Sequence, residues 1–432
     1  MTVEQITPPL AADAAALRER FRRVRALSRE LCEPLQPEDF RIQSMPDVSP
    51  PWWNLGHTSW FFAKNILEPR TGFAFPSPGF EYVLNSYYEA HGERVPRHER
   101  GLQGRPTTDE ILAFRKDVDR RMEELLDSSS EDPELHFLTT TGIEHEQQHQ
   151  ELLVTEIKHI LGTNARSLRP LYSERRAAPS STSPSSWIPF EGGLYDVGNL
   201  EGSWCWDNEL PVHKTWIDPF SLASRLVTVG EYLQFMEDDG YRRALLWMSN
   251  GWGAVGSSGW EAPLYWERDG DTWTQWTLNG QRELEVDEPV SHVSFYEADA
   301  FANWRALQED GPGSVRLPTE REWEVACRTA EDRGALLDDE EYHPQSARGE
   351  GLSQMIGDLW EWTSSHYEPY PNYRPFAGDL QEYNGKFMDN QRVLRGGSCA
   401  TPADHIRSSY RNFWPGDTRF QFTGIRLARA AT

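Results

Sequence analysis

The chain has 432 residues, more than one hydrophobic core usually organises, so we expect two domains. Its 43 Lys and Arg against 68 Asp and Glu give a net charge of −25, which disfavours nucleic acid and anionic membranes and favours small-molecule substrates. The four cysteines are scattered without a C-x-x-C pair, which argues against a disulfide framework or a cysteine zinc site. With no signal peptide or apolar run of membrane-spanning length, we expect a cytoplasmic protein.

Apolar residues recur at three- and four-residue spacing in the first half, which predicts a four-helix bundle. The four helical segments are 11–31, 54–67, 108–126 and 134–161. Thr107 and Glu110 form a capping box at the start of the third segment. The long stretch 68–106, rich in Pro, Gly and aromatic residues, is interpreted as a functional loop, with disorder as the alternative.

A Ser-, Pro- and Ala-rich stretch, 173–186, cannot bury enough apolar surface to fold. We therefore place a linker at 166–187, between a bundle at 1–165 and a second domain at 188–432. The second domain has an α+β pattern, with short strands expected in 192–199, 211–228, 289–295, 392–398 and 424–429. Capping boxes predict three helix starts there, at Thr228 with Glu231, Ser294 with Glu297, and Thr319 with Glu322.

The fourth helical segment contains His145-Glu146-Gln147-Gln148-His149, which matches the H-E-x-x-H pattern of zinc peptidases. Histidines four residues apart share a helix face, here in line with Leu153 and Ile157 of the stripe that faces the core. Buried imidazoles need hydrogen-bond partners or a metal, so a core pair with polar partners is an alternative to a metal site. A peptidase would also need a third ligand downstream, where Glu151 is too close and Glu156 lies only seven residues past the second histidine.

His57, in the second helical segment, offers a different third ligand, because ligands in a helical bundle converge from different helices. With His145 and His149 it would complete a three-histidine site, although a buried or capping histidine is the alternative. Three neutral imidazoles suit iron, copper, nickel or zinc, so the ligand set does not identify the metal. Gln148 lies near the metal-facing side of the helix, where its amide could hold a polar substrate or remain solvated.

Several segments together resemble the ergothioneine-biosynthesis sulfoxide synthases (EgtB). They are the segment around His57, "EHEQQHQE", "NSYYEAHG", the Ser/Pro linker, "RLPTEREWEVACR", "GDLWEWTSS", "RVLRGGS" and "RSSYRNFWPGDTRFQFTGIRLAR". The resemblance extends over nearly the entire chain. It implies an α+β multidomain fold, in which an N-terminal DinB-like four-helix bundle is followed by a C-type-lectin-like domain of the formylglycine-generating-enzyme type.

The resemblance implies a non-haem iron(II) enzyme that uses O2 to join a thiol sulfur to imidazole C2 of hercynine, the Nα-trimethylated histidine, while oxidising that sulfur to a sulfoxide. The iron ligands would be His57, His145 and His149. Neutral imidazoles leave the iron positively charged, which favours deprotonation of a thiol bound beside it. Gln148 matches the family glutamine that hydrogen-bonds the hercynine imidazole, and Asn412 matches an asparagine placed near the same substrate.

Members of this family differ in their thiol donor, which is γ-glutamylcysteine or free cysteine. In the first type an aspartate lies two residues after the asparagine, but here that position is Trp414, preceded by Phe413. The sequence therefore resembles the cysteine-using branch. Arg97 and Arg94 match arginines that hold the thiol substrate's carboxylate, and Asp47 could meet its ammonium group. Without the resemblance, each of these charges would be interpreted as a surface charge.

The resemblance also implies a tyrosine that donates a proton during oxygen reduction and steers the reaction toward C–S bond formation, away from thiol dioxygenation. Tyr88 with Tyr87, in "NSYYEAHG", resembles the pair of the cysteine-using branch, whereas Tyr367 and Tyr370 are the candidates in the second domain. We favour Tyr88 and Tyr87 as the catalytic residues. Core packing is the alternative for all four rings.

Cys327 and Cys399 do not look like the reactive pair that formylglycine-generating chemistry needs, and both are interpreted as structural. Two further alternatives are an ovothiol-type sulfoxide synthase acting on histidine, which usually carries an additional methyltransferase domain not seen here, and a metal-binding module without catalysis. The partners we expect are hercynine, cysteine and O2, without nucleic acid or membrane. The expected cofactor is Fe(II).

Overall fold

A computed structural model describes residues 14–129, 131–175, 181–349 and 351–431. The chain divides into two compact units. The first comprises the residues up to Tyr172 with Gly202–Trp204 and Ala377–Glu382, and the second comprises Ser173–Glu201, Cys205–Phe376 and Tyr383–Thr432. Residues 11–13 of the first predicted helix and 176–180 of the predicted linker lie outside the described residues.

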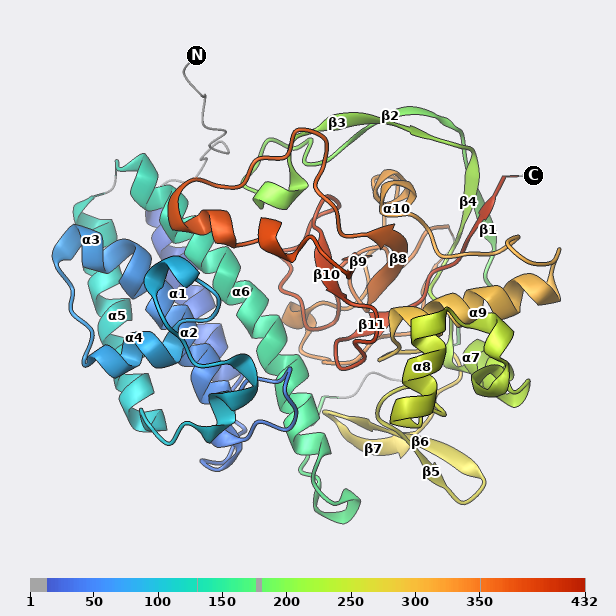
Figure 1. The fold of residues 1–432 in the computed structure, drawn as a ribbon, viewed down its shortest axis with the longest axis horizontal. Helices are drawn as coiled ribbons and strands as arrows, with labels where there is room; N and C mark the ends of the chain where they lie inside the picture. The colour runs from blue at the N-terminus through green and yellow to red at the C-terminus, as the bar shows by residue number, and fades with distance from the viewer. Residues whose placement is uncertain (1–13, 130, 176–180, 350, 432) are drawn as a thin grey trace. The chain divides into compact units, whose positions relative to one another are not determined.

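The first unit is built on a helical bundle (Figure 1). The α-helices described in this unit are α1 (Ala14–Glu30), α2 (Pro51–Phe62), α3 (Glu68–Thr71), α4 (Pro78–Leu84), α5 (Thr108–Ser128) and α6 (Pro133–Gly162). Of these, α1, α2, α5 and α6 pack together, α1 against α5 and α6 and α2 against the same two helices. The four-helix bundle predicted from the apolar spacing is therefore confirmed.

Local sequence signals explain where these helices begin. Pro51 is the first residue of α2, a position whose amide hydrogen has no partner within the helix. The Asp132 side chain accepts two backbone N–H groups from the first turn of α6. Thr107 and Glu110 form the predicted capping box at α5, which is confirmed.

The stretch between α2 and α5 is folded into short helical elements. A π-helical turn, η2 (Ala63–Leu67), continues α2 into α3, and the 3-10 turns η3 (Glu89–His91) and η4 (Arg97–Leu102) follow α4. Helix α4 packs against α2. This arrangement places the Tyr87–Tyr88 pair between α4 and η3, within the first unit.

The second unit is α+β, as predicted. Its helices are α7 (Val229–Glu237), α8 (Ser249–Ser258), α9 (Phe295–Gln308) and α10 (Glu320–Cys327) among the described residues. Its strands are β1 (Trp187–Phe190), β2 (Gly193–Val197), β3 (His213–Ile217), β4 (Phe220–Ala223), β5 (Trp266–Asp269), β6 (Thr272–Thr277), β7 (Gly280–Glu283), β8 (Trp360–His366), β9 (Gln391–Arg395), β10 (Asn412–Pro415), β11 (Thr423–Gly424) and β12 (Ala428–Ala430).

The strands form small sheets. The largest has the order β10-β9-β8-β11, with β11 parallel to β8 and the other pairs antiparallel. Three-stranded sheets β1-β4-β12 and β5-β6-β7 and the two-stranded sheet β2-β3 complete the described set. The capping boxes predicted at α7, α9 and α10 are all present.

Two sequence interpretations of the second unit need correction. The strand predicted at 289–295 is wrong, because Ser294 caps α9 and only an isolated bridge between Thr228 and Pro289 forms there. Strands β1, β8 and β10 and the β5-β6-β7 sheet were not predicted, although Gly270 and Gly280, both with positive φ, mark the two turns of that sheet.

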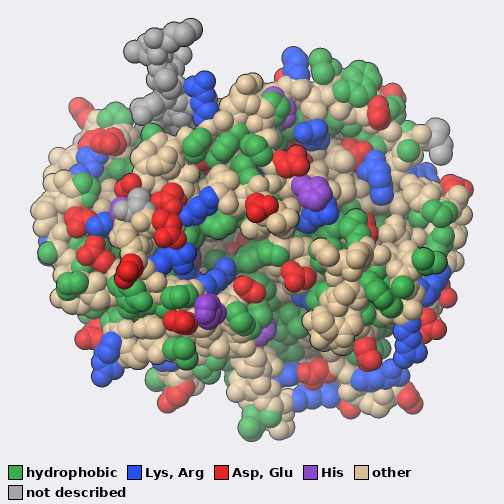
Figure 2. All heavy atoms as spheres, in the orientation of Figure 1, with side chains coloured by type: hydrophobic (Ala, Val, Ile, Leu, Met, Phe, Trp, Pro, Cys, Tyr) green, Lys and Arg blue, Asp and Glu red, His purple; other side chains and the backbone are tan. Residues whose placement is uncertain are grey.

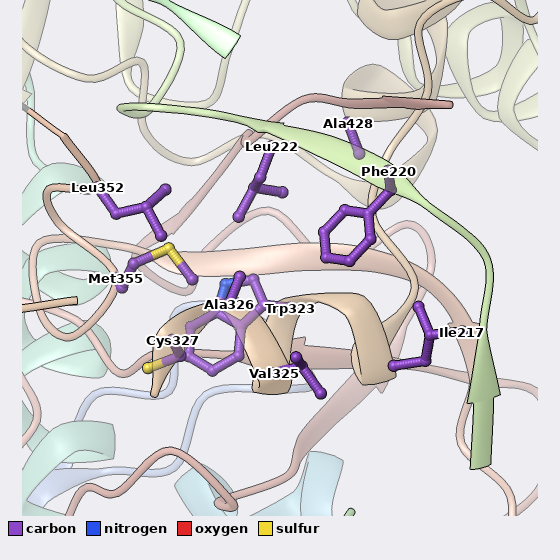
Figure 3. Close-up of a cluster of buried hydrophobic side chains, with 10 residues drawn as sticks. All are labelled: Ile217, Phe220, Leu222, Trp323, Val325, Ala326, Cys327, Leu352, Met355 and Ala428. Carbon is purple, nitrogen blue, oxygen red and sulfur yellow. The ribbon is translucent and has the colours of Figure 1, made fainter. Parts of the chain in front are cut away.

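A hydrophobic cluster around α10 forms a core of the second unit (Figure 3). Trp323 and Cys327 of α10 pack there with Phe220 and Leu222 of β4. The Trp323 indole Nε1 also donates to the buried Glu361 carboxylate at 2.6 Å. Cys327 on the apolar side of its helix agrees with the structural role expected for it.

Charged side chains of both signs are interspersed on the visible face of the molecule (Figure 2). This face therefore does not present a surface of a single charge sign. None of the helices in the described ranges is both long enough and apolar enough to cross a lipid bilayer.

Candidate metal centre

Two helices of the bundle bring three histidines together. His57 lies on α2, and His145 and His149 lie one turn apart on α6. One ring nitrogen from each histidine lies within 4.8 Å of those of the other two. The ring centroids are separated by 4.7 to 5.0 Å. These three imidazoles therefore form one cluster within the first unit.

Hydrogen bonds fix the orientation of two of these rings. His57 Nδ1 donates to the main-chain oxygen of Leu84 at 2.7 Å, and His149 Nδ1 donates to Asn54 Oδ1 at 2.7 Å. A neutral imidazole that donates from Nδ1 keeps its lone pair on Nε2. Buried His57 Nε2 has no hydrogen-bond partner among the described residues. Both rings thus present Nε2 as a ligand atom.

The electrostatic environment keeps the three histidines neutral. Burial is the largest cause in each ring, lowering the pKa of His57 and His149 well below the usual range and that of His145 to about 3. Neighbouring charges also disfavour protonation of His57 and His149, including the Arg100 guanidinium. Neutral imidazole is the form that binds a metal ion.

The cluster fits a transition-metal ion. Two imidazole nitrogens bound to one ion at roughly 2.1 Å can be at most about 4.2 Å apart, so a small contraction brings the donors into range. A set of three neutral nitrogen donors suits iron, copper, nickel or zinc. By geometry, protonation and ligand type, the three histidines are therefore residues that could hold a metal ion.

Glu146 faces away from this cluster. Its Oε2 accepts from Arg25 Nη1 at 2.7 Å, and its Oε1 accepts from Ser28 Oγ at 2.6 Å and from Arg115. Burial alone would raise the pKa of Glu146, but the two guanidinium groups hold it at about 2. A zinc peptidase needs this carboxylate as a general base beside its metal. The zinc-peptidase reading of the motif is therefore rejected.

Aromatic rings surround His57. Trp53 stacks on its imidazole with centroids 4.6 Å apart, and the Arg100 guanidinium lies 3.4 Å from the Trp53 ring centroid. Trp60 lies roughly parallel to the same imidazole at 5.7 Å. His57, the two tryptophan rings and the Arg100 guanidinium form one packed stack, which limits the movement of the His57 ring.

Tyr88 lies next to this aromatic group. Its ring is fully buried, 5.7 Å from Trp60, and stacked on Tyr87 at 5.1 Å. Burial raises the pKa of Tyr88 well above its usual value, and the neighbouring Tyr87 and Glu382 raise it further. Tyr88 therefore keeps its phenolic proton at neutral pH.

The alternative tyrosines belong to the interior of the second unit. The Tyr367 hydroxyl accepts from Asn208 Nδ2 at 2.9 Å, and the Tyr370 hydroxyl accepts from Arg395 Nη2 at 3.0 Å. Burial raises the pKa of both phenols well above the usual range. Their hydroxyl groups already have partners within that unit.

The predicted substrate residues of the first unit have different environments. Half-buried Gln148 precedes His149 on α6, and the Arg97 charge contributes to the lowered pKa of His149. Arg94 is paired with Glu89 at 2.9 Å, and Asp47 is exposed ahead of α2. Gln148 is thus the sequence neighbour of His149, and Arg97 lies close enough to His149 to influence its charge.

The predicted substrate residues of the second unit lie on β10. Asn412, Phe413 and Trp414 are all half-buried there. The Phe413 ring stacks on Tyr367 at 4.0 Å, and the Asn412 side-chain oxygen accepts the Phe413 N–H at 2.8 Å. Pairing with β9 holds the backbone of all three residues.

Sequence reasoning missed the residues behind the metal ligands. Leu84 and Asn54 accept from the histidine rings, and Asn54 Nδ2 donates to Glu156 Oε2 at 2.6 Å. Glu156 was considered only as a third ligand for a peptidase. The sequence signal that could have indicated such a partner is Asn54, a polar residue one helical turn before His57 and therefore on the same helix face.

The cysteines do not form a reactive pair. All four are free and buried, and burial raises the pKa of the Cys327 thiol to about 12. Formylglycine-generating chemistry needs reactive cysteines. The described structure therefore gives no support to that activity.

Comparisons with known proteins cover both halves of the chain. Residues 20–153 match the DinB superfamily, and residues 173–431 match the sulfatase-modifying factor enzyme 1-like domain. These matches agree with the DinB-like bundle and the formylglycine-generating-enzyme-like domain expected from the sequence.

Several curated proteins are similar to this chain. The hercynine oxygenase of Mycolicibacterium thermoresistibile is 30% identical over 431 residues, covering 90% of this chain and 89% of that protein. The hercynine oxygenase of Mycolicibacterium smegmatis is 30% identical over 423 residues, covering 89% and 92%. Ergothioneine biosynthesis protein 1 of Schizosaccharomyces pombe is 28% identical over 237 residues, covering 52% of this chain and 27% of that protein.

Proposed function

Because this chain belongs to the hercynine oxygenase family, we propose that it is an iron(II)- and O2-dependent sulfoxide synthase of ergothioneine biosynthesis. The proposed reaction joins the cysteine sulfur to imidazole C2 of hercynine and yields hercynyl cysteine sulfoxide. One oxygen atom of O2 enters the sulfoxide, and the other leaves as water with the thiol and C2 hydrogens. The cluster of three neutral histidines, of which His57 and His145 are buried and His149 is half-buried, is the observation that carries this proposal.

His57, His145 and His149 would hold the iron. When bound there, iron(II) would supply positions for the thiolate, the hercynine imidazole and O2, together with the redox chemistry. The three ligands are neutral, so the positive charge of the ion stays available to favour the thiolate. The hydrogen bonds from Nδ1 of His57 and His149 keep their ligand atoms pointed at the ion.

Tyr88 would supply the proton for oxygen reduction. Its phenol is protonated at neutral pH, as any tyrosine is, and burial raises its pKa further. Trp60 connects the ring by packing to His57. Proton delivery from the Tyr88 hydroxyl would favour C–S bond formation over dioxygenation of cysteine to its sulfinate. Tyr87, stacked on Tyr88, would keep that ring in place.

Hercynine would be held by Gln148 and Asn412. The Gln148 amide follows His145 by three residues on α6 and would hydrogen-bond the hercynine imidazole. Asn412 on β10 would contact the same substrate. Each amide can donate as well as accept, which suits an imidazole that carries one nitrogen of each kind.

The thiol substrate would be cysteine. Arg97, with Arg94, would bind its carboxylate, and Asp47 would meet its ammonium group. Trp414, preceded by Phe413, stands at the sequence position where an aspartate serves γ-glutamylcysteine. A ring at that position cannot form an ion pair with the ammonium group of the γ-glutamyl unit.

Anaerobic reconstitution with iron(II), followed by O2 and mass spectrometry, tests the proposed function. The mixture offers hercynine and histidine together with cysteine and γ-glutamylcysteine in competition. Hercynyl cysteine sulfoxide as the main product is the expected result. Consumption of histidine alone would indicate the ovothiol-type reaction, a γ-glutamylcysteine adduct would change the thiol donor, and absence of iron-dependent turnover would contradict the proposal.

A further inference from the structure

A buried chain of hydrogen bonds runs behind His149. Its Nδ1 donates to Asn54 Oδ1 at 2.7 Å, and Asn54 Nδ2 donates to Glu156 Oε2 at 2.6 Å. The other carboxylate oxygen, Glu156 Oε1, accepts the backbone N–H of Ser49 at 2.8 Å. Asn54 is 1% exposed and Glu156 is 0% exposed, so water does not compete for these bonds.

The direction of the chain follows from the chemistry of its members. An ionised carboxylate only accepts, so the Asn54 amide must turn its NH2 group to Glu156 and its oxygen to His149. That oxygen also only accepts, so His149 must carry its proton on Nδ1. The lone pair then lies on Nε2, the nitrogen available to a metal.

A reversed amide would disable the ligand. With its NH2 group turned to His149, Asn54 would donate to Nδ1, and the imidazole proton would move to Nε2. A protonated Nε2 cannot bind a metal ion. The state of the His149 ligand atom thus depends on a carboxylate that does not touch the ring.

We propose that Glu156 is a positioning residue, which selects the metal-binding tautomer of His149 by orienting the Asn54 amide. This inference rests on the proposed metal site. His57 needs no such residue, because its Nδ1 partner is the main-chain oxygen of Leu84, which has no donor to exchange with. His149 has a side-chain partner that can rotate, and Glu156 removes that freedom.

A glutamate is the residue that this position requires. Burial of a carboxylate is costly, and here it raises the pKa of Glu156 to about 7, opposed by the Arg97 and Arg100 charges. A glutamine of the same shape offers one acceptor and one donor, so it cannot accept from both Ser49 and Asn54. Two acceptor oxygens on one side chain satisfy both donors.

Metal affinity of the full-length protein tests the inference. Cobalt(II), whose visible absorption reports its coordination, is titrated against a competing chelator at pH 8, where Glu156 is ionised. Glu156→Gln should weaken cobalt(II) binding about 10- to 100-fold, as expected for a residue that orients a ligand. Glu144→Gln is the matched control, since Glu144 lies on the same helix but pairs with Arg20. Its affinity should equal that of the wild type.

A double variant separates positioning from general damage to the fold. The double variant Asn54→Asp with Glu156→Gln exchanges the amide and the carboxylate between the two positions. The amide at position 156 can accept from Ser49 and donate to the carboxylate at position 54, and that carboxylate again accepts from His149 Nδ1. Cobalt(II) affinity should recover to within a few-fold of the wild type. Thermal unfolding of each metal-free variant shows whether it is folded.

Three results would overturn the inference. They are wild-type affinity in Glu156→Gln, an equal loss in the Glu144→Gln control, and no recovery in the folded double variant. The proposed function fails separately, when wild-type protein binds the metal but forms no sulfoxide. A wild type that binds no cobalt(II) or iron(II) would refute the metal site and this inference together.

Discussion

Helix α6 has two neighbouring faces that differ in what their polar side chains do. On one face, His145 and His149 point toward His57 and keep nitrogen lone pairs for a ligand. On the other face, Glu146 is bound by two arginines, and Gln150 Nε2 donates to the main-chain oxygen of Val24. The first face directs ring nitrogens toward a third histidine, whereas the polar side chains of the second face are bound to α1 and α5. The H-E-x-x-H match therefore combines the proposed metal-binding pair with a glutamate that two arginines bind.

The largest effect is expected from His149→Ala on the histidine face. Loss of one of three ligands should weaken iron(II) binding by more than about 100-fold, beyond the cost of disturbing a residue behind a ligand. Sulfoxide formation should fall below detection. Iron(II) titration with product analysis measures both, and turnover close to wild type would remove His149 from the site.

Glu146→Gln should lower stability and leave iron(II) binding and turnover largely unchanged, the opposite of His149→Ala. Removing this charge leaves Arg25 and Arg115 buried without their shared partner, which should lower the free energy of unfolding by roughly 3–5 kcal/mol. Urea denaturation of the metal-free protein measures the loss. Turnover per folded, iron-loaded molecule should stay near wild type, and a selective loss of chemistry would assign Glu146 to the reaction.

Tyr88→Phe should change the product of the reaction and leave metal binding unchanged. Without a phenolic proton donor, sulfoxide formation should slow by about 100-fold, the lower range for general acids, and cysteine sulfinate should accumulate. The ratio of the two products by mass spectrometry is the measurement. Tyr87→Phe serves as the matched control with a smaller expected change. An unchanged ratio in Tyr88→Phe would exclude it as the proton donor.

Substitution of two glutamines on α6 is expected to have the smallest effects, and the two variants are the most closely matched pair. Gln148→Ala should raise the KM for hercynine about tenfold, the effect of one lost hydrogen bond of roughly 1.4 kcal/mol, with little change in stability. Gln150→Ala should instead cost about 1–3 kcal/mol of stability, because it leaves the Val24 oxygen and Ser28 with fewer partners. If both variants changed the same quantity, the two faces would not differ as described.

The bundle was predictable because its signals are local. Apolar spacing gives α5 and α6, and the Thr107–Glu110 box gives the start of α5. In the second unit the same local signals predict helix starts well and strands less well. The segment 289–295 has strand-like residues, yet Ser294 already belongs to the cap of α9. Short strands depend on pairing partners that lie far away in the sequence.

The residues of the candidate site were predictable only where they are close together in the sequence or match a family motif. His145 and His149 are joined by one helical turn, and His57 was a candidate third ligand from its place in the bundle, which the resemblance then matched to the family's ligand set. The bonds from His149 to Asn54 and from Asn54 to Glu156 connect residues 95 and 102 positions apart, so no local pattern reveals them. The direction in which Glu146 points likewise depends on Arg25 and Arg115, from two other helices.

Anaerobic iron(II) titration of three proteins, wild type, His149→Ala and Glu146→Gln, tests the division of α6 most directly. It is carried out under conditions where all three are folded. One equivalent of iron(II) should bind to the wild type and to Glu146→Gln with similar affinity, and binding to His149→Ala should be much weaker. Retention of iron(II) by His149→Ala together with its loss in Glu146→Gln would contradict this account.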